Sequence, residues 1–101
     1  MVKIVIAYPP PTDVAAFDSH YLETHIPLCR RLPGLRRAEV VHLKGAPDVS
    51  RPLYILTEFY FDDRDAMRNA LKSPEMAACV ADLKAHLPGS SDVYFSDDIQ
   101  D

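Results

Sequence analysis

The stretch from Leu53 to Phe61 places the tightest limit on the fold, because its side chains alternate in character. Every second residue suits a hydrophobic core, and the residues between them are aromatic, acidic or aliphatic. The first set is Leu53, Ile55, Thr57, Phe59 and Phe61, and the second is Tyr54, Leu56, Glu58 and Tyr60. Successive side chains of a β-strand point to opposite faces, so this pattern predicts a strand with one face in the core.

Three further segments have the composition or the alternation of strands. Val2–Tyr8 is rich in β-branched residues and ends at three consecutive prolines. Leu35–Lys44 alternates with mixed faces, and Val93–Ser96 alternates before a polar C-terminal segment. We therefore expect four strands.

Apolar residues at helical spacing fill the segments between the first two and the last two strands. The first helix follows the prolines, and the second region holds a short helix and a longer one that restarts at a serine and a proline. The expected caps and stops are Thr12 or Asp13, Leu32–Gly34, Asp62 or Asp63, Ser73 and Pro88–Gly89.

The resulting order, β-α-β-β-α-β, predicts an α+β ferredoxin-like domain over residues 1–101, with helices on one face of an antiparallel sheet. The other face would carry more apolar and aromatic side chains than a solvated surface normally exposes. Pairing two such sheets would bury them. We expect a homodimer whose sheets close into a barrel around a cavity.

The apolar stripe of the first helix contains two groups that a simple core would not choose, Tyr21 and His25, spaced i and i+4 so that they can meet. Pro27 lacks an N–H and crowds the preceding turn, so we expect a kink or a break there, with Ile26 pushed towards extended geometry. On a straight helix His20 and His25 stand about 140° apart. A metal site on this helix is therefore disfavoured, and we predict none.

Composition excludes several classes of function. A net charge of −4 gives no basic footprint for nucleic acid. Cys29 and Cys79 lie far apart in sequence and are expected to be small buried side chains. The N-terminal apolar run is too short for a signal peptide and no run approaches a membrane span, so we expect a cytoplasmic protein. The three glycines are scattered and form no phosphate-binding loop, and we expect no cofactor.

Several motifs together resemble the EthD family of dimeric α+β barrel proteins, named for ethyl tert-butyl ether degradation. They are Phe17-Asp18-x-His20-Tyr21-x-x-x-His25-x-Pro27-Leu28, Leu32-Pro33-Gly34-Leu35-Arg36, Ala70-Leu71-x-Ser73-Pro74-Glu75 and Asp82-Leu83. The resemblance implies ferredoxin-like protomers paired through their sheets, with a ligand pocket between helices and sheet or inside the barrel. It also implies kinship with proteins that act without cofactors on small aromatic compounds. Of the family's site, His25, Pro27 and the aromatic Tyr21 match.

His25 is the candidate acid or base, with Tyr21 orienting it or sharing its proton. The alternative is that His25 bonds a carbonyl freed by Pro27 and holds the kink together. Glu58 could face a cavity with a raised pKa, or form an ion pair across the dimer with Arg36, Arg37 or Lys3. The candidate ligand-binding residues are Phe17, His20, Leu28, Tyr54 and Glu58.

The leading hypothesis is a small-molecule-binding protein that acts on an apolar or aromatic compound by His-assisted proton transfer. Its reaction would be that of an isomerase, a lyase or a monooxygenase, an oxidoreductase of a catabolic pathway. The competing hypothesis is a non-catalytic carrier or an accessory subunit of a degradation pathway. A cavity walled only by apolar groups would favour the carrier, whereas a polar group converging with His25 would favour the enzyme.

Overall fold

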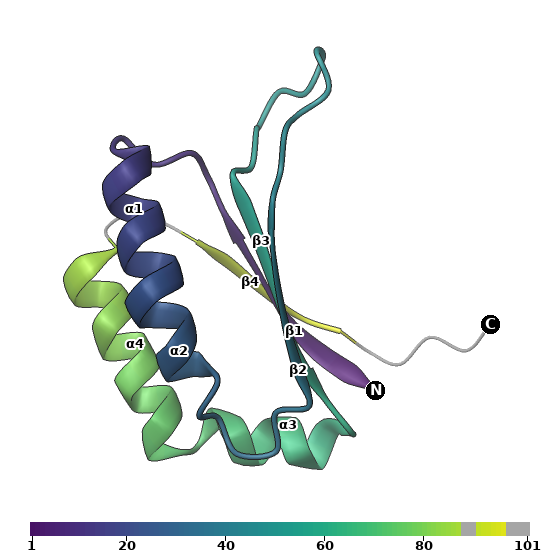
Figure 1. Cartoon of the computed structure of the whole chain (residues 1–101). Coiled ribbons are helices and arrows are strands. Elements are labelled where there is room, and N and C mark those ends of the chain that lie inside the picture. Colours follow the sequence, from purple (N-terminus) through teal and green to yellow (C-terminus); the bar gives the residue numbers. More distant parts are fainter. Residues whose placement is uncertain (88–90, 97–101) are drawn as a thin grey trace.

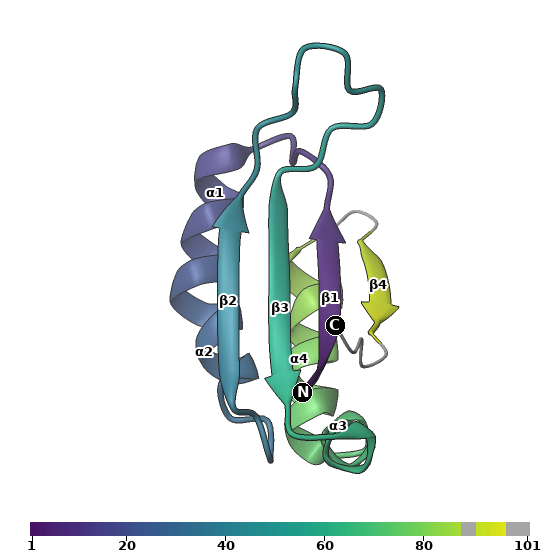
Figure 2. The same cartoon turned by 90° about the vertical axis from the view of Figure 1, so that its right-hand side faces the viewer.

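A computed structural model describes residues 1–87 and 91–96 of the chain. Its centre is a four-stranded antiparallel sheet in the order β2-β3-β1-β4 (Figure 2). The strands are β1 (Val2–Tyr8), β2 (Arg37–His42), β3 (Ile55–Phe61) and β4 (Asp92–Phe95). The four predicted strands and the α+β ferredoxin-like architecture are confirmed, with β2 shorter than expected.

The helices all lie on one side of this sheet (Figure 1). The first helical stretch runs without a break through three segments, and the second consists of a short and a long helix. In chain order they are α1 (Val14–His20), η1 (Tyr21–His25), α2 (Ile26–Cys29), α3 (Arg64–Leu71) and α4 (Pro74–His86). The helical layer and the inner face of the sheet enclose the core.

Side-chain caps fix where three of these helices begin. Asp13, Asp63 and Ser73 each accept a hydrogen bond from the backbone N–H three residues later, at 3.0, 2.8 and 3.1 Å. Such a cap satisfies one of the N–H groups that the first turn leaves without a partner. Gly34 has a φ of +74°, the left-handed turn expected after the first helix. The expected stop at Pro88–Gly89 lies outside the described residues.

Of the kink or break expected at Pro27, the break was wrong, because the helical segments run on through the proline by way of a π-turn. Ile26 keeps helical geometry, with φ −60° and ψ −42°, and its N–H donates to the carbonyl of Tyr21, five residues back. This wider turn shifts the backbone hydrogen bonding by one residue just before Pro27. The helix therefore continues through the proline, although the proline has no N–H to donate. The side chains on either side of η1 are therefore related by a different rotation about the helix axis than they would be on a straight α-helix.

The two faces of the sheet differ as the alternation predicted. In β3 the inward set, Ile55, Thr57, Phe59 and Phe61, is buried, and the residues between them are half-buried. Cross-strand pairing places Ile4 beside Phe59 and Ile6 beside Thr57 on the inner face. A buried inner face and a half-buried outer face are what a sheet with helices on one side requires.

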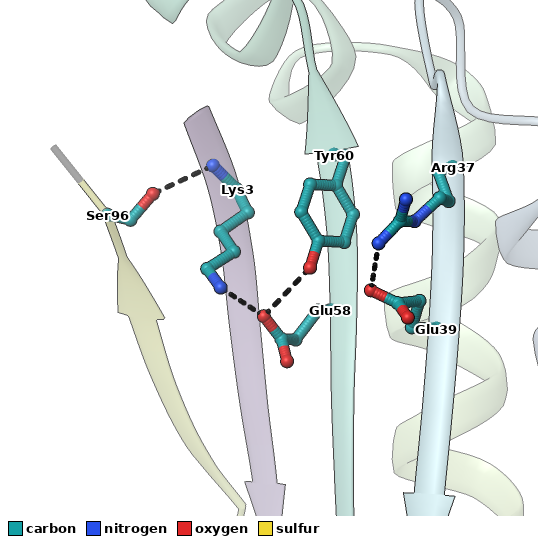
Figure 3. Close-up of polar contacts among 6 residues, drawn as sticks. All are labelled: Lys3, Arg37, Glu39, Glu58, Tyr60 and Ser96. Atoms are coloured by element: carbon teal, nitrogen blue, oxygen red, sulfur yellow. Dashed lines mark hydrogen bonds and ion pairs between the residues drawn. The ribbon is translucent and has the colours of Figure 1, made fainter. Parts of the chain in front are cut away.

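The outer face carries a row of polar contacts (Figure 3). Lys3 forms an ion pair with Glu58, whose carboxylate also accepts from the Tyr60 hydroxyl at 3.3 Å. Arg37 donates to Glu39 at 2.6 Å on the neighbouring strand. Charged groups thus share this face with exposed apolar side chains.

Candidate functional site

A cavity of about 320 Å³ lies between the inner face of the sheet and the helices. Its walls are almost wholly apolar, with Ile4 and Phe59 from the sheet and Leu32, Met76 and Leu83 from the helical layer. This volume falls at the lower end of the range for small-molecule pockets. The resemblance to the EthD family implied a pocket either between helices and sheet or inside the barrel, and this cavity lies between helices and sheet.

His25 is one of the few polar groups that line the cavity. It is the last residue of η1 and only 3% exposed. Its Nδ1 lies 2.9 Å from Oδ2 of Asp82, on α4. Because an ionised carboxylate only accepts hydrogen bonds, Nδ1 carries the proton and Nε2 keeps a free lone pair. A buried imidazole with this tautomer has the arrangement of a general base.

The alternative in which His25 bonds a backbone carbonyl next to Pro27 does not match this geometry. Its Nδ1 bonds a carboxylate from another helix, and its Nε2 lies 3.5 Å from the Cys29 thiol. Since Nε2 carries no proton, the Cys29 S–H is the donor in this contact, and a thiol donates only a weak hydrogen bond to the Nε2 lone pair. The imidazole is thus held by tertiary contacts.

The π-turn brings His20 and His25 to the same carboxylate. His20 Nε2 lies 2.9 and 3.0 Å from the two oxygens of Asp82, and its ring packs on His86 with centroids 4.6 Å apart. On a straight helix the two histidines would diverge, but residues five apart close one turn of a π-helix. Residues 1–87 and 91–96 nevertheless contain no group of three or more side chains suited to a metal ion.

The protonation states follow from burial and this pairing. Burial lowers the pKa of His25, and Asp82 only partly opposes that effect. Burial raises the pKa of Asp82, but the hydrogen bonds from His20 and His25 outweigh it, so the net pKa lies below the ordinary value. Near neutral pH, Asp82 is therefore charged and His25 is neutral and able to accept a proton.

Tyr21 contacts His25, as the i, i+4 spacing predicted, but the contact is made by the tyrosine ring and not by its hydroxyl. The two rings stack with centroids 5.3 Å apart, whereas the Tyr21 hydroxyl lies 2.5 Å from the Thr57 hydroxyl. Burial raises the pKa of Tyr21 far above its usual range. Tyr21 is placed to orient His25, and its hydroxyl is engaged in the core.

Tyr8 is a second polar group in the cavity wall. It is 4% exposed, and its hydroxyl is buried without a well-formed hydrogen bond to the part of the chain that is described. Burial raises its pKa to about 12, with a smaller opposing effect from Tyr21.

The predicted ligand-binding residues lie outside the walls of this cavity. Phe17 packs against three tyrosine rings, Tyr54 donates to Asp18 at 2.7 Å, and Leu28 borders a shallow surface pocket with Arg31. Glu58 lies on the outer face in its ion pair with Lys3, one of the expected partners but within the same protomer. His20 reaches the site only through Asp82.

Asp82 is the residue of this candidate site to which the sequence assigned no role, since it stood out only in the motif Asp82-Leu83. Its side chain is only 11% exposed. Its spacing held a signal, because Asp82 follows Cys79 by three residues and so lies on nearly the same helical face. Cys79 and Cys29 line the cavity as the expected buried thiols, and burial raises the pKa of both.

The described residues include no helix long and apolar enough to cross a membrane.

The sequence and the fold of the chain are similar to those of known proteins. Residues 9–86 match the EthD domain. An uncharacterised 11.0 kDa protein of Rhodococcus erythropolis, from the thcB-thcC intergenic region, is 32% identical over 97% of this chain and 95% of its own length.

Two crystal structures extend the comparison. An ethyl tert-butyl ether degradation (EthD) family protein from Bacillus halodurans is 32% identical, with a TM-score of 0.89 over 98% of this chain and 99% of its own. SnoaB, a cofactor-independent oxygenase from Streptomyces nogalater, shares the fold at 21% identity, with a TM-score of 0.66 over 99% and 94% of the two chains. The domain match and the two relatives of 32% identity agree, and this chain therefore belongs to the EthD family.

Proposed function

We propose that this protein binds a small apolar or aromatic compound in the cavity and removes a proton from it, with His25 as general base and Asp82 as the residue that positions it. The observation that carries the proposal is the buried His25 imidazole, bonded through Nδ1 to a carboxylate and bordering an apolar cavity. A positioned general base contributes about 10²- to 10⁴-fold to the rate of a proton transfer.

The proposed step needs no redox partner. A C–H or O–H bond of the ligand breaks, its proton moves to Nε2 of His25, and the electron pair stays on the ligand as a carbanion, enolate or phenolate. The charged Asp82 stabilises the imidazolium that forms, since its oxygen lies 2.9 Å from Nδ1. Return of the proton to a different atom gives an isomerisation. SnoaB, which has a similar fold, is a cofactor-independent oxygenase, and this supports catalysis without a cofactor on the fold.

The second candidate function is that of a carrier or an accessory subunit that binds the same class of compound without changing it. The apolar walls of the cavity favour this function. The two functions differ in one observable, which is proton exchange between the bound compound and water.

The protein is also proposed to act as a homodimer through the outer face of its sheet. The helices leave that face uncovered (Figure 2), and Val41 and Tyr94 expose 45% and 58% of their surface there. The family fold, the dimeric α+β barrel, supports pairing of these faces. The polar row of Lys3, Glu58 and Tyr60 would then border the interior of the barrel.

Hydrogen–deuterium exchange of 2-tetralone tests the proposed chemistry without knowledge of the natural substrate. This bicyclic ketone is apolar and has acidic C–H groups beside its carbonyl. In D₂O near neutral pH, the wild-type protein is expected to accelerate loss of the α-proton signals in the NMR spectrum. His25→Gln removes the base and is expected to reduce this acceleration about 100-fold or more.

Binding of 2-tetralone, measured in the same samples, separates the two functions. Binding with exchange that depends on His25 supports the enzyme. Binding with exchange no faster than in buffer would leave the carrier. The matched control is His42→Gln. His42 is the exposed last residue of the edge strand β2, contacts Asp18 and does not line the cavity.

A further inference from the structure

The Tyr8 hydroxyl is a buried polar group that the proposed proton transfer does not use. Tyr8 is the last residue of β1, and its carbonyl accepts from the Tyr54 N–H at 2.7 Å, which fixes the backbone at this point. Its ring lines the cavity while its hydroxyl has no well-formed hydrogen bond within the described residues. Burying a hydroxyl without a partner destabilises the protein, whereas phenylalanine would fill the same space without that penalty.

Tyr8 and His25 both contact the ring of Tyr21. The Tyr21 ring stacks on His25 at 5.3 Å and meets the Tyr8 ring edge-to-face at 5.0 Å. The Tyr21 hydroxyl is committed to Thr57. Among the residues that line the cavity, His25 offers a proton acceptor at Nε2, and Tyr8 and Ser91 carry hydroxyls. Of these two hydroxyls, that of Tyr8 is the one that is buried without a hydrogen bond within the described residues.

The chemistry of the Tyr8 hydroxyl limits what it can recognise. Burial holds its pKa at about 12, so it stays protonated near neutral pH and is available as a hydrogen-bond donor. Its natural partner is an uncharged or weakly basic oxygen that arrives with the ligand. A wholly hydrocarbon ligand would leave this hydroxyl unpaired.

We infer that Tyr8 recognises a carbonyl oxygen of the ligand, and that the substrates of this site are carbonyl compounds with an acidic C–H beside the carbonyl. This inference rests on the proposed function and names its substrate class. When the C–H bond breaks, the proton goes to His25 Nε2 and the electron pair moves through the new C=C bond onto the oxygen. The resulting enolate accepts the Tyr8 hydrogen bond, which is stronger to an anionic oxygen than to a neutral carbonyl.

The test compares two ligands that differ only in the carbonyl group. Binding of 2-tetralone and of its hydrocarbon analogue tetralin is measured by ligand-observed NMR with wild-type protein and with Tyr8→Phe. The variant is expected to bind the ketone about tenfold more weakly, because one hydrogen bond is lost, and to bind tetralin within twofold of the wild type. Tetralin binding also shows that the variant has kept its cavity.

The outcomes separate this inference from the proposed base. Equal loss of affinity for both ligands, or ketone binding unchanged by Tyr8→Phe, overturns it. Wild-type protein that binds the ketone no more tightly than tetralin overturns it as well. His25→Gln is expected to keep the preference for the ketone while losing exchange, so exchange that persists in that variant refutes the base and leaves the role of Tyr8 standing.

Discussion

Asp82→Asn is the substitution that most directly tests how the site is held together. The change keeps the size of the side chain and removes its charge. In the wild type, one carboxylate accepts from His25 Nδ1 at 2.9 Å and from His20 Nε2 at 2.9 and 3.0 Å. The single carbonyl oxygen of asparagine can still accept from one histidine, but its amide group meets the other as a donor.

The expected loss of stability is about 2 kcal/mol near neutral pH. A hydrogen bond to a charged group contributes about 1.5–3 kcal/mol, and the asparagine retains part of one of the two. The contact with His25 dominates, since that side chain is 4% exposed, whereas the His20 side chain is 24% exposed and can turn to water. For a domain of this length, a loss of that size lowers the midpoint of thermal unfolding by about 10 °C.

Thermal unfolding followed by circular dichroism at one fixed protein concentration measures this loss, because the midpoint of a dimer depends on concentration. Asp65→Asn is the control. That side chain is 88% exposed and contacts Arg68 at 3.6 Å, so its removal is expected to cost less than about 0.5 kcal/mol. An Asp82→Asn midpoint within about 2 °C of the wild type would refute the reasoning that this carboxylate holds the two histidines.

Two further predictions concern pH and assembly. Because burial lowers the pKa of His25, the unfolded chain binds a proton more readily than the folded one as the pH falls below 6.5, so stability falls there by at most about 1.4 kcal/mol per pH unit. Asp82, whose pKa is lowered, adds a second loss below about pH 4, as the carboxylate becomes protonated. Urea unfolding from pH 7 to pH 5 measures the first loss, and His25→Gln should abolish it; an unchanged slope in that variant would assign the loss to other groups. Leu56→Lys, on the outer face, is expected to give monomers in sedimentation velocity, whereas Val14→Lys on α1 is expected to keep the proposed dimer. A Leu56→Lys protein that still forms a dimer would contradict pairing through this face.

The predictions that held were those that rest on local chemistry. Alternation along β3 depends only on the two-residue period of a strand, so Ile55–Phe61 and its buried face were visible in the sequence. Caps such as Asp63 and Ser73 act within one turn of their own helix and were visible for the same reason. The i, i+4 contact between Tyr21 and His25 was likewise local.

The partners of those groups depend on contacts between segments that lie far apart in the sequence. A helix can accommodate a proline such as Pro27 by a break or by a π-turn. In this fold, where α2 packs in the helical layer, the chain forms the π-turn, and both His20 and His25 then contact Asp82. Asp82 lies 57 residues from His25 in sequence, so no local pattern could pair them. Local periodicity was enough to find the strands, the helices and His25. The cavity, the contact between Asp82 and His25, and the Tyr8 hydroxyl that has no hydrogen bond within the described residues depend on how the sheet and the helices pack in space, because local periodicity does not encode contacts between distant segments.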